Sequence, residues 1–301
     1  MSEQLVLQSE ADAIVVSAGD VDIARYVFEP DAPEEEAPKP FLHPLKTLSG
    51  ATLSVHRPWD HRWHKGLQMT WSHVSGENFW GGPTFDRDEG YRWIDNLGSI
   101  NHESFSSTDE GGDGVSFTEH LAWFNSKGER WIKEVRTHSF HSVDVERGLW
   151  ILDFSTTLTN VRNADLVFGS PGTEGRDDAG YTGYFWRGPR SFTGGTVISS
   201  TGLSETQLMG TEADWVAFVG PHDDVDGGAS VLVFAGSVAP EVPIKWFVRS
   251  EPFACIAPSA SFDNEIVLAP GRTLSLQHRH VFVDHAATAD ELSALGKELA
   301  L

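Results

Sequence analysis

The sequence predicts an all-β protein, a large antiparallel β-sandwich that ends in one short helix. Segments rich in β-branched and aromatic residues recur along most of the chain, and Gly, Pro, Asp or Ser bounds each of them. Helical periodicity is confined to the C-terminus. No repeat of fixed length is visible, which disfavours a propeller or a solenoid. The chain has 301 residues, 40% of them hydrophobic. We expect one domain over residues 1–301, because single all-β domains often reach roughly 200–250 residues.

An antiparallel meander is expected near the middle of the chain. It comprises residues 115–125, 129–143 and 149–161, which the turn sequences SKG and DVERG connect. Strands are also expected on both sides of the segment DHRWHKGL, at residues 52–57 and 65–71. The later strands are predicted at residues 214–220, 229–236, 244–250, 253–258, 264–271 and 273–283.

Three segments are predicted to lie outside this strand pattern. Residues 29–40 are acidic and rich in proline, which indicates an exposed loop. Residues 169–195 contain eight glycines, and a loop of that length inside a compact domain is usually functional. Thr288 and Glu291 form a capping box, and three leucines that follow share one helical face. A helix over about residues 288–300 is therefore expected to cover the edge of a sheet.

The charge of the chain restricts its partners. Lys plus Arg is 22 and Asp plus Glu is 44, so the formal net charge is −22. Such a surface repels nucleic acid and anionic lipid, and a highly anionic ligand would need a local basic patch. The N-terminus lacks a signal-peptide pattern and no apolar run could span a bilayer, so a cytoplasmic location is expected. Cys255, the single cysteine, is expected to be a buried, inert thiol.

The stretch DHRWHKGL, residues 60–67, is the strongest candidate for chemistry. Protein cores exclude so many charged and titratable groups, so a loop that lines a cavity is expected. Histidine titrates near neutral pH, and a neighbouring carboxylate sets its tautomer and charge. We expect His64 to be the acid or base, with His61 second and Asp60 assisting. Arg57 and Lys65 are expected to hold oxygen atoms of a substrate.

Two other interpretations of this stretch stay open. Asp60, Arg62 and Lys65 could form an ordinary exposed salt-bridge cluster. His61 and His64 could instead bind a metal with a third ligand, and His278 and His280 form another pair on one face of a strand. No spacing matches a strong metal motif such as His-Glu-x-x-His, so no cofactor is expected.

Aromatic residues point to a sugar ligand. Of eleven tryptophans, five stand beside polar residues and could stack on the C–H face of a sugar ring. They are Trp59, Trp63, Trp80, Trp93 and Trp186. Five others lie inside strand patterns and are expected in the core: Trp123, Trp131, Trp150, Trp215 and Trp246. The glycine-rich segment adds polar and aromatic groups, namely Arg176, Asp177, Asp178, Tyr181, Tyr184, Trp186, Arg187 and Arg190. Tyr181, Trp186, Arg187 and Arg190 are the expected substrate-binding residues of this segment.

These motifs together resemble the PmoA-like family of uncharacterised bacterial proteins. The sequences DHRWHKGL, SGENFW and GYTGYFWRGPR occur in the family's order. The matching positions are Asp60, His61, His64, Gly66, Leu67, Gly76, Phe79, Trp80, Gly180, Tyr181 and Gly183. Trp63 stands where the family has histidine, and Lys65 where it has arginine. The resemblance implies a galactose mutarotase-like β-supersandwich that binds sugars in an open cleft, with a role in sugar catabolism.

Three functions follow from these observations. The first is a carbohydrate-active enzyme that uses acid–base chemistry for epimerisation, elimination or glycoside cleavage. The second is a protein that binds or senses sugars without catalysis, and the third is a metal-dependent oxygenase or hydrolase. All three place a small-molecule ligand where the histidine-rich and glycine-rich segments meet across one β surface. The sequence leaves the sugar, the bond and the oligomeric state open.

Overall fold

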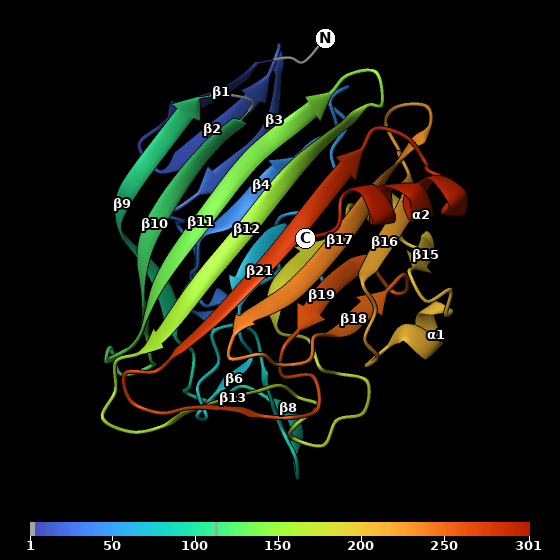
Figure 1. The fold of residues 1–301 in the computed structure, drawn as a ribbon. Coiled ribbons are helices and arrows are strands. Elements are labelled where there is room, and N and C mark those ends of the chain that lie inside the picture. Colours follow the sequence, from blue (N-terminus) through green and yellow to red (C-terminus); the bar gives the residue numbers. More distant parts are fainter. Residues whose placement is uncertain (1–3, 112–113) are drawn as a thin grey trace.

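Two eight-stranded antiparallel sheets form the molecule in a computed structural model, which describes residues 4–111 and 114–301 (Figure 1). The order of the first sheet is β1 (Leu5–Ser9), β2 (Ala13–Ala18), β3 (Val21–Val27), β4 (Phe41–Leu45), β5 (Leu67–Thr70), β14 (Gly183–Arg187), β19 (Cys255–Ser259), β18 (Lys245–Arg249). The order of the second is β15 (Thr196–Ser199), β16 (Trp215–Pro221), β17 (Gly228–Ala239), β21 (Thr273–Val283), β12 (Leu149–Asn160), β11 (Arg130–Asp144), β10 (Gly114–Phe124), β9 (Ser99–Gly111).

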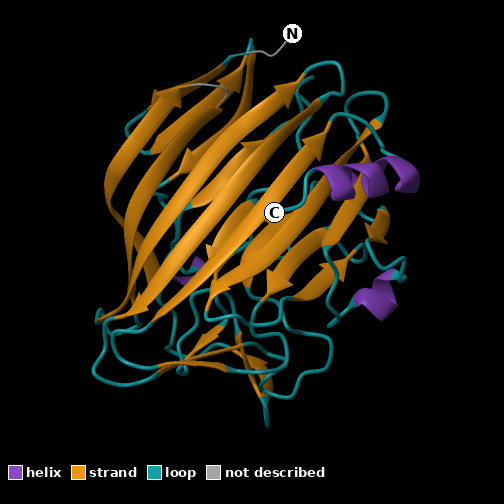
Figure 2. Ribbon diagram, in the orientation of Figure 1, coloured by secondary structure: helices purple, strands orange, loops and turns teal. Residues whose placement is uncertain are grey.

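Two small sheets and four short helices complete the described part of the chain (Figure 2). One small sheet has the order β20 (Ile266–Leu268), β13 (Leu166–Gly169), β6 (His73–Val74), and the other pairs β7 (Thr84–Asp86) with β8 (Gly90–Arg92). The helices are η1 (Glu34–Glu36), η2 (Arg190–Phe192), α1 (Glu205–Leu208) and α2 (Ala289–Glu298). None of the helices in the described residues has the length and apolar character that crossing a membrane requires.

The core lies between the two large sheets and follows from strand alternation. Successive side chains of a strand point to opposite faces. On β14, Tyr184 and Trp186 belong to the inter-sheet cluster, whereas Phe185 belongs to a separate cluster on the other face. The predicted large antiparallel β-sandwich with a short C-terminal helix is therefore confirmed. The five tryptophans expected in the core are all buried.

Helix α2 covers a sheet face rather than a sheet edge. Its capping box forms as predicted, because the Thr288 side chain accepts from the Glu291 amide and Glu291 bonds back to Thr288. Helix α2 lies over the outer face of the second sheet (Figure 1). Leu292 and Leu295 of this helix belong to one buried cluster with Trp215. The sequence pattern identified the apolar stripe, but it carried no information on which apolar surface would receive it.

Three expectations about local structure were wrong. The segment 169–195 is not one loop, because its residues 183–187 form β14 in the middle of the first sheet. The segment 29–40 is not simply exposed, since it contains η1, and Glu36 is buried. Residues 52–57 form no regular strand, and their β pairing is limited to isolated bridges, such as that between His56 and Lys65.

Candidate functional site

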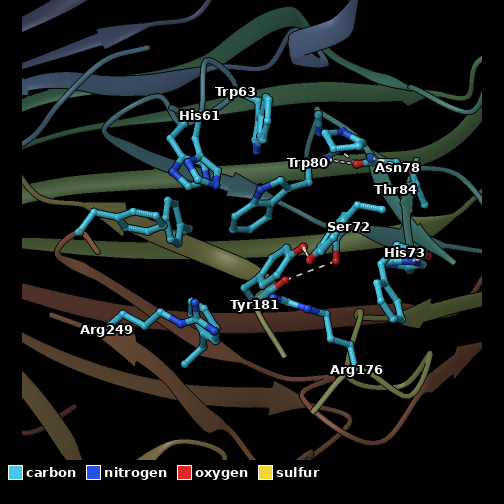
Figure 3. Close-up of a pocket in the computed structure, with 18 of the residues that line it drawn as sticks. His61, Trp63, Ser72, His73, Asn78, Trp80, Thr84, Arg176, Tyr181 and Arg249 are labelled. Carbon is cyan, nitrogen blue, oxygen red and sulfur yellow. Dashed lines mark hydrogen bonds between the residues drawn. The ribbon is translucent and has the colours of Figure 1, made fainter. Parts of the chain in front are cut away.

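A pocket of about 400 Å³ lies on the face of the first sheet that is turned away from the core. Phe185, Phe247 and Arg249 line it, and they alternate along β14 and β18 with the buried core residues Trp186, Trp246 and Val248. Its full lining is His61, Trp63, His64, Ser72, His73, Asn78, Trp80, Gly81, Pro83, Thr84, Phe85, Tyr91, Arg176, Tyr181, Phe185, Phe247, Arg249, Pro252 and Phe253. The histidine-rich and glycine-rich segments thus line one cavity (Figure 3).

The loop that carries the two histidines is closed by backbone hydrogen bonds. The Arg57 amide donates to the His64 carbonyl at 2.9 Å. The His61 amide donates to the Pro58 carbonyl at 3.1 Å, and the His64 amide donates to the His61 carbonyl at 3.0 Å. Arg57 adopts a positive φ of 50°, which turns the chain into the loop. This fold brings the His61 and His64 rings into a stacked arrangement with centroids 4.8 Å apart.

His64 is held by an arginine, and this fixes its chemistry. Nη1 of Arg187 lies 2.8 Å from Nδ1 of His64. Because arginine can only donate, Nδ1 must accept, so the proton of the neutral ring sits on Nε2. Burial lowers the pKa of His64 well below its ordinary value, and the neighbouring His61 and Arg187 lower it further. His64 is therefore a neutral N–H donor at neutral pH rather than a base.

Asp60 forms an ion pair with Arg187 and does not line the pocket. Nη2 of Arg187 lies 3.2 Å from Oδ2 of Asp60, and Nη2 of Arg190 lies 3.6 Å from Oδ1. Burial opposes ionisation of Asp60, but the charge and hydrogen bond of Arg187 outweigh it and lower the pKa of Asp60. The guanidinium carbon of Arg187 also sits 3.6 Å from the centre of the Phe253 ring. Asp60 and Arg187 are thus positioning residues for His64.

His61 has the opposite neighbour. Its Nδ1 lies 3.7 Å from Oδ2 of Asp60, which is too far for a hydrogen bond, so the carboxylate acts on this ring through its charge and favours a proton on Nδ1 and the lone pair on Nε2. Burial lowers the pKa of His61, while the carboxylate of Asp60 raises it in partial compensation. Its side chain is 34% exposed, so the ring is open to solvent and ligand. The two stacked histidines therefore differ: His61 has a base-like environment and His64 a donor environment.

Aromatic rings form the walls of the pocket. The centroid of the Trp80 ring lies 4.8 Å from the ring centroids of both Tyr181 and Phe185, and the ring centroids of Trp63 and His61 are 5.2 Å apart. Trp63 is placed by a close backbone approach at Gly82, which has a φ of +71°. A Cβ at Gly82 would stand 2.5 Å from Cε2 of Trp63. Apolar walls with a few placed polar groups are typical of small-molecule sites.

Several predicted site residues lie elsewhere. Arg57 binds Glu36 through Nε and Nη2, the latter at 2.7 Å, and buried Lys65 pairs with the same carboxylate. Both cations therefore form ion pairs with Glu36, which belongs to the segment 29–40 that was expected to be an exposed loop. Trp186 is a core residue, since its Nε1 donates to the Leu53 carbonyl at 2.8 Å. The expectations that Arg57, Lys65 and Trp186 contact a substrate do not agree with these positions.

The structure adds residues that the sequence analysis did not assign to the site. Arg249 lines the pocket from β18, and the signal for it is its spacing of two from Phe247, which places both on one strand face. His73 and Thr84 come from the small sheets at one end of the molecule. Their strands have two and three residues, too short for a periodic pattern to reveal.

No group of three metal-binding side chains occurs in the described residues 4–111 and 114–301. His278 and His280 are buried between the sheets and do not line this pocket, and burial lowers both pKa values to about 3.

The fold and the site thus define a β-sandwich protein with a histidine-containing pocket on one sheet. The chain belongs to a family of unknown function, DUF6807, whose family model matches residues 13–297. The expected membership of the PmoA-like family was wrong, because the family model that matches is this one. A search of curated proteins finds no match to the chain.

Solved structures with a similar fold include two α-galactosidases and an epimerase. The α-galactosidase from Lactobacillus brevis is 10% identical with a TM-score of 0.44, over 95% of this chain and 40% of that chain. The GH36 α-galactosidase AgaB from Geobacillus stearothermophilus is 9% identical with a TM-score of 0.47, over 94% and 41%. The galactose 1-epimerase from Lactobacillus acidophilus is 8% identical with a TM-score of 0.39, over 95% and 99%. The chain spans about two fifths of the length of the galactosidases.

Proposed function

We propose that this protein is an enzyme that transfers protons on a sugar or sugar derivative, as in epimerisation or elimination. The stacked His61–His64 pair carries the proposal, because the two imidazoles have opposite neighbours in one pocket. A pair of titratable groups in unlike environments is a common basis for assigning a base and an acid. His61 is the base through Nε2, and His64 donates a hydrogen bond from its Nε2–H to a substrate oxygen.

His61 and His64 together account for the proton and the charge in the proposed step. His61 takes a proton from a C–H next to a carbonyl, and the electron pair moves onto the carbonyl oxygen, which His64 stabilises by hydrogen bonding. Return of that proton from His61 to the other face, after the intermediate has turned in the pocket, gives an epimer. Expulsion of a neighbouring oxygen, which takes the same proton from His61 as it leaves, gives an elimination product. Glycoside cleavage is less well supported, because it normally uses two carboxyl groups at the bond, and Asp60 is turned towards Arg187.

The walls support a sugar as the ligand. Trp63, Trp80 and Tyr181 surround the cavity with flat aromatic faces, while Asn78, Ser72 and Thr84 add hydrogen-bonding groups. The cavity volume of about 400 Å³ lies within the range typical of small-molecule sites.

Proton exchange with deuterium oxide tests the proposal and does not require the product to be identified. Sugars and sugar acids would be incubated with the enzyme in deuterium oxide, and loss of a C–H signal would be followed by proton NMR. We expect exchange in the wild type and a rate lower by roughly 100-fold or more in His64→Gln and in His61→Gln. His141→Gln removes a histidine from the Asp153 pair on the second sheet and should leave the rate unchanged.

A protein that binds or senses sugars without catalysis gives a different result. In that case a sugar binds, but no carbon exchanges its proton at any pH between about 5 and 9, the range over which histidine and its neighbours titrate. That outcome would refute the enzymatic proposal and favour the binding protein.

A further inference from the structure

The charged side chains that line the pocket, within the described residues, are Arg176 and Arg249. We propose that the ligand carries an oxyanion, the carboxylate or phosphate of an acidic sugar derivative, which binds between these two arginines. This inference deepens the proposed function by naming the substrate class, and it rests on the same pocket. It requires a local basic patch in a strongly acidic chain, and the two arginines supply it.

Arg249 faces the cavity from the last residue of β18. Its Nη2 donates to the Asp178 backbone carbonyl at 3.3 Å, and its guanidinium carbon lies 5.0 Å from the centre of the Phe247 ring. In the part of the chain that the structure describes, no carboxylate oxygen lies within ion-pair distance of it. The backbone contact uses one of five donors, so the fork keeps donors for a planar anion.

Arg176 approaches the same point from the glycine-rich segment. Its guanidinium carbon lies 5.0 Å from the centre of the Tyr91 ring, and the hydroxyl of Tyr91 bonds that of Tyr181 at 2.6 Å. Burial and Tyr91 raise the pKa of Tyr181, whereas the charges of Arg176 and Arg249 both act to lower it. The charges of both arginines therefore reach one hydroxyl, that of Tyr181, which is hydrogen-bonded to Tyr91.

Other arginines inside this acidic chain are arranged differently. Acidic residues outnumber basic ones by 44 to 22. Buried Arg136 pairs with Glu134 at 2.8 Å, and half-buried Arg279 pairs with Asp153 at 2.6 Å. Arginine is the side chain best suited to bidentate binding of carboxylate and phosphate, and an anionic ligand would complete both forks in the pocket.

The pocket then has two chemically different ends. Figure 3 shows His61 at one end, Arg176 and Arg249 at the other, and the Trp80 ring between them. A sugar ring against Trp80 would direct its anionic group to the arginines and its reacting carbon to the histidines. The arginines thus fix the orientation of the substrate, which proton transfer at one carbon requires.

Matched pairs of neutral and acidic sugars test the inference. Binding of glucose, glucuronate and glucose 6-phosphate, and of galactose and galacturonate, would be measured by calorimetry at low and high salt. We expect an acidic probe to bind more tightly than its neutral counterpart, with a preference that falls as salt rises. The carboxylate and phosphate probes tell which oxyanion the site takes.

Arginine variants assign the preference to the site. Arg176→Gln or Arg249→Gln should weaken binding of the acidic probe by about 10- to 100-fold and leave the neutral sugar unaffected. Arg249→Lys keeps the charge without the fork and should recover only part of the loss. Arg147→Gln removes the same charge from the exterior pair with Glu298 and should change nothing.

Two results would overturn the inference: no acidic probe preferred over its neutral counterpart, or a preference that persists in the Arg176→Gln/Arg249→Gln double variant. Proton exchange on an acidic sugar at the wild-type rate in that double variant would also overturn it, while leaving the proposed function intact. If acidic probes bind in an arginine-dependent way but no proton exchange occurs, the anion site is supported and the catalytic proposal is refuted.

Discussion

Glu36→Gln is the sharpest test of how the loop of residues 57–65 is held. Glu36 is 2% exposed and accepts from Arg57 through both oxygens, while Lys65 donates to the same carboxylate. Lys65 is 1% exposed, so removal of the Glu36 charge leaves a buried ammonium without its counter-ion. If this cluster anchors the loop, the variant loses stability; if Arg57 and Lys65 instead serve a substrate, stability changes little.

The expected loss comes mainly from Lys65. Breaking a buried ion pair by removal of one partner costs about 3–5 kcal/mol. The Arg57 side chain is 36% exposed, so water screens its share and compensates for its loss. Glutamine can still accept one hydrogen bond, which places the expected decrease in unfolding free energy near the lower end, about 3 kcal/mol.

Urea denaturation followed by tryptophan fluorescence measures this loss, and Glu35→Gln is the matched control. Glu35 is the adjacent residue of η1 and is exposed, so its replacement should leave the denaturation midpoint unchanged. Adding Lys65→Met to Glu36→Gln should recover part of the stability, because both members of the buried pair are then gone. Equal stability of Glu36→Gln and Glu35→Gln would refute the reasoning.

The same cluster predicts a pH dependence. Burial opposes ionisation of Glu36, but hydrogen bonds and charges of Arg57 and Lys65 outweigh it and lower its pKa. A carboxyl group with a lowered pKa in the folded state stabilises the fold above its unfolded pKa of about 4.3, and this contribution is lost as the pH falls further. The stability gap between wild type and Glu36→Gln should therefore shrink in acid.

Three further predictions concern the pocket and its surroundings. Burial lowers the pKa of His61, so its unprotonated form persists into mildly acidic solution. The exchange rate should therefore be constant near neutral pH and fall only below about pH 6.5. A decrease that begins above about pH 7.5 as the pH is lowered would argue against His61 as the base. Gly82→Ala should weaken sugar binding by displacing Trp63, whereas Gly128→Ala, also at positive φ but with open space around it, should not; equal binding by both would exclude the steric argument. Trp186→Ala should lower the unfolding free energy by about 3–5 kcal/mol, because it truncates a core side chain. A variant with normal stability but weakened sugar binding would instead indicate that Trp186 contacts the ligand.

The main features of the fold could be predicted from the sequence, because strand alternation and turn residues are local signals. The meander of β10, β11 and β12 has long strands and short turns, and its pattern is unambiguous. β14 was missed because glycines surround it and because all five of its residues are buried, which removes the alternation that marks a half-exposed strand. That residues 1–301 form one domain stays a prediction.

The site was only partly predictable. His61, His64 and Tyr181 were recognised from the sequence and now line one pocket. The pairing of Arg57 and Lys65 with Glu36 was not predictable, because Glu36 comes from about twenty to thirty residues earlier and no local pattern shows which acid of the sequence EEE turns inward. Glu34 and Glu35 stay exposed, while the chain turn at Ala37, with φ of 48°, carries Glu36 into the fold. Tertiary pairing of this kind is invisible to spacing.

The arginine behind His64 changes the chemistry that the sequence analysis assigned to it. A carboxylate at Nδ1 would leave Nε2 as a base, whereas Arg187 at Nδ1 makes Nε2 a donor. The base then has to be another group, and His61 stacks on the same ring with a carboxylate near its own Nδ1. Asp60 therefore acts on both histidines, through Arg187 for His64 and by its charge for His61. One half-buried carboxylate beside one arginine is enough to give two adjacent imidazoles different roles.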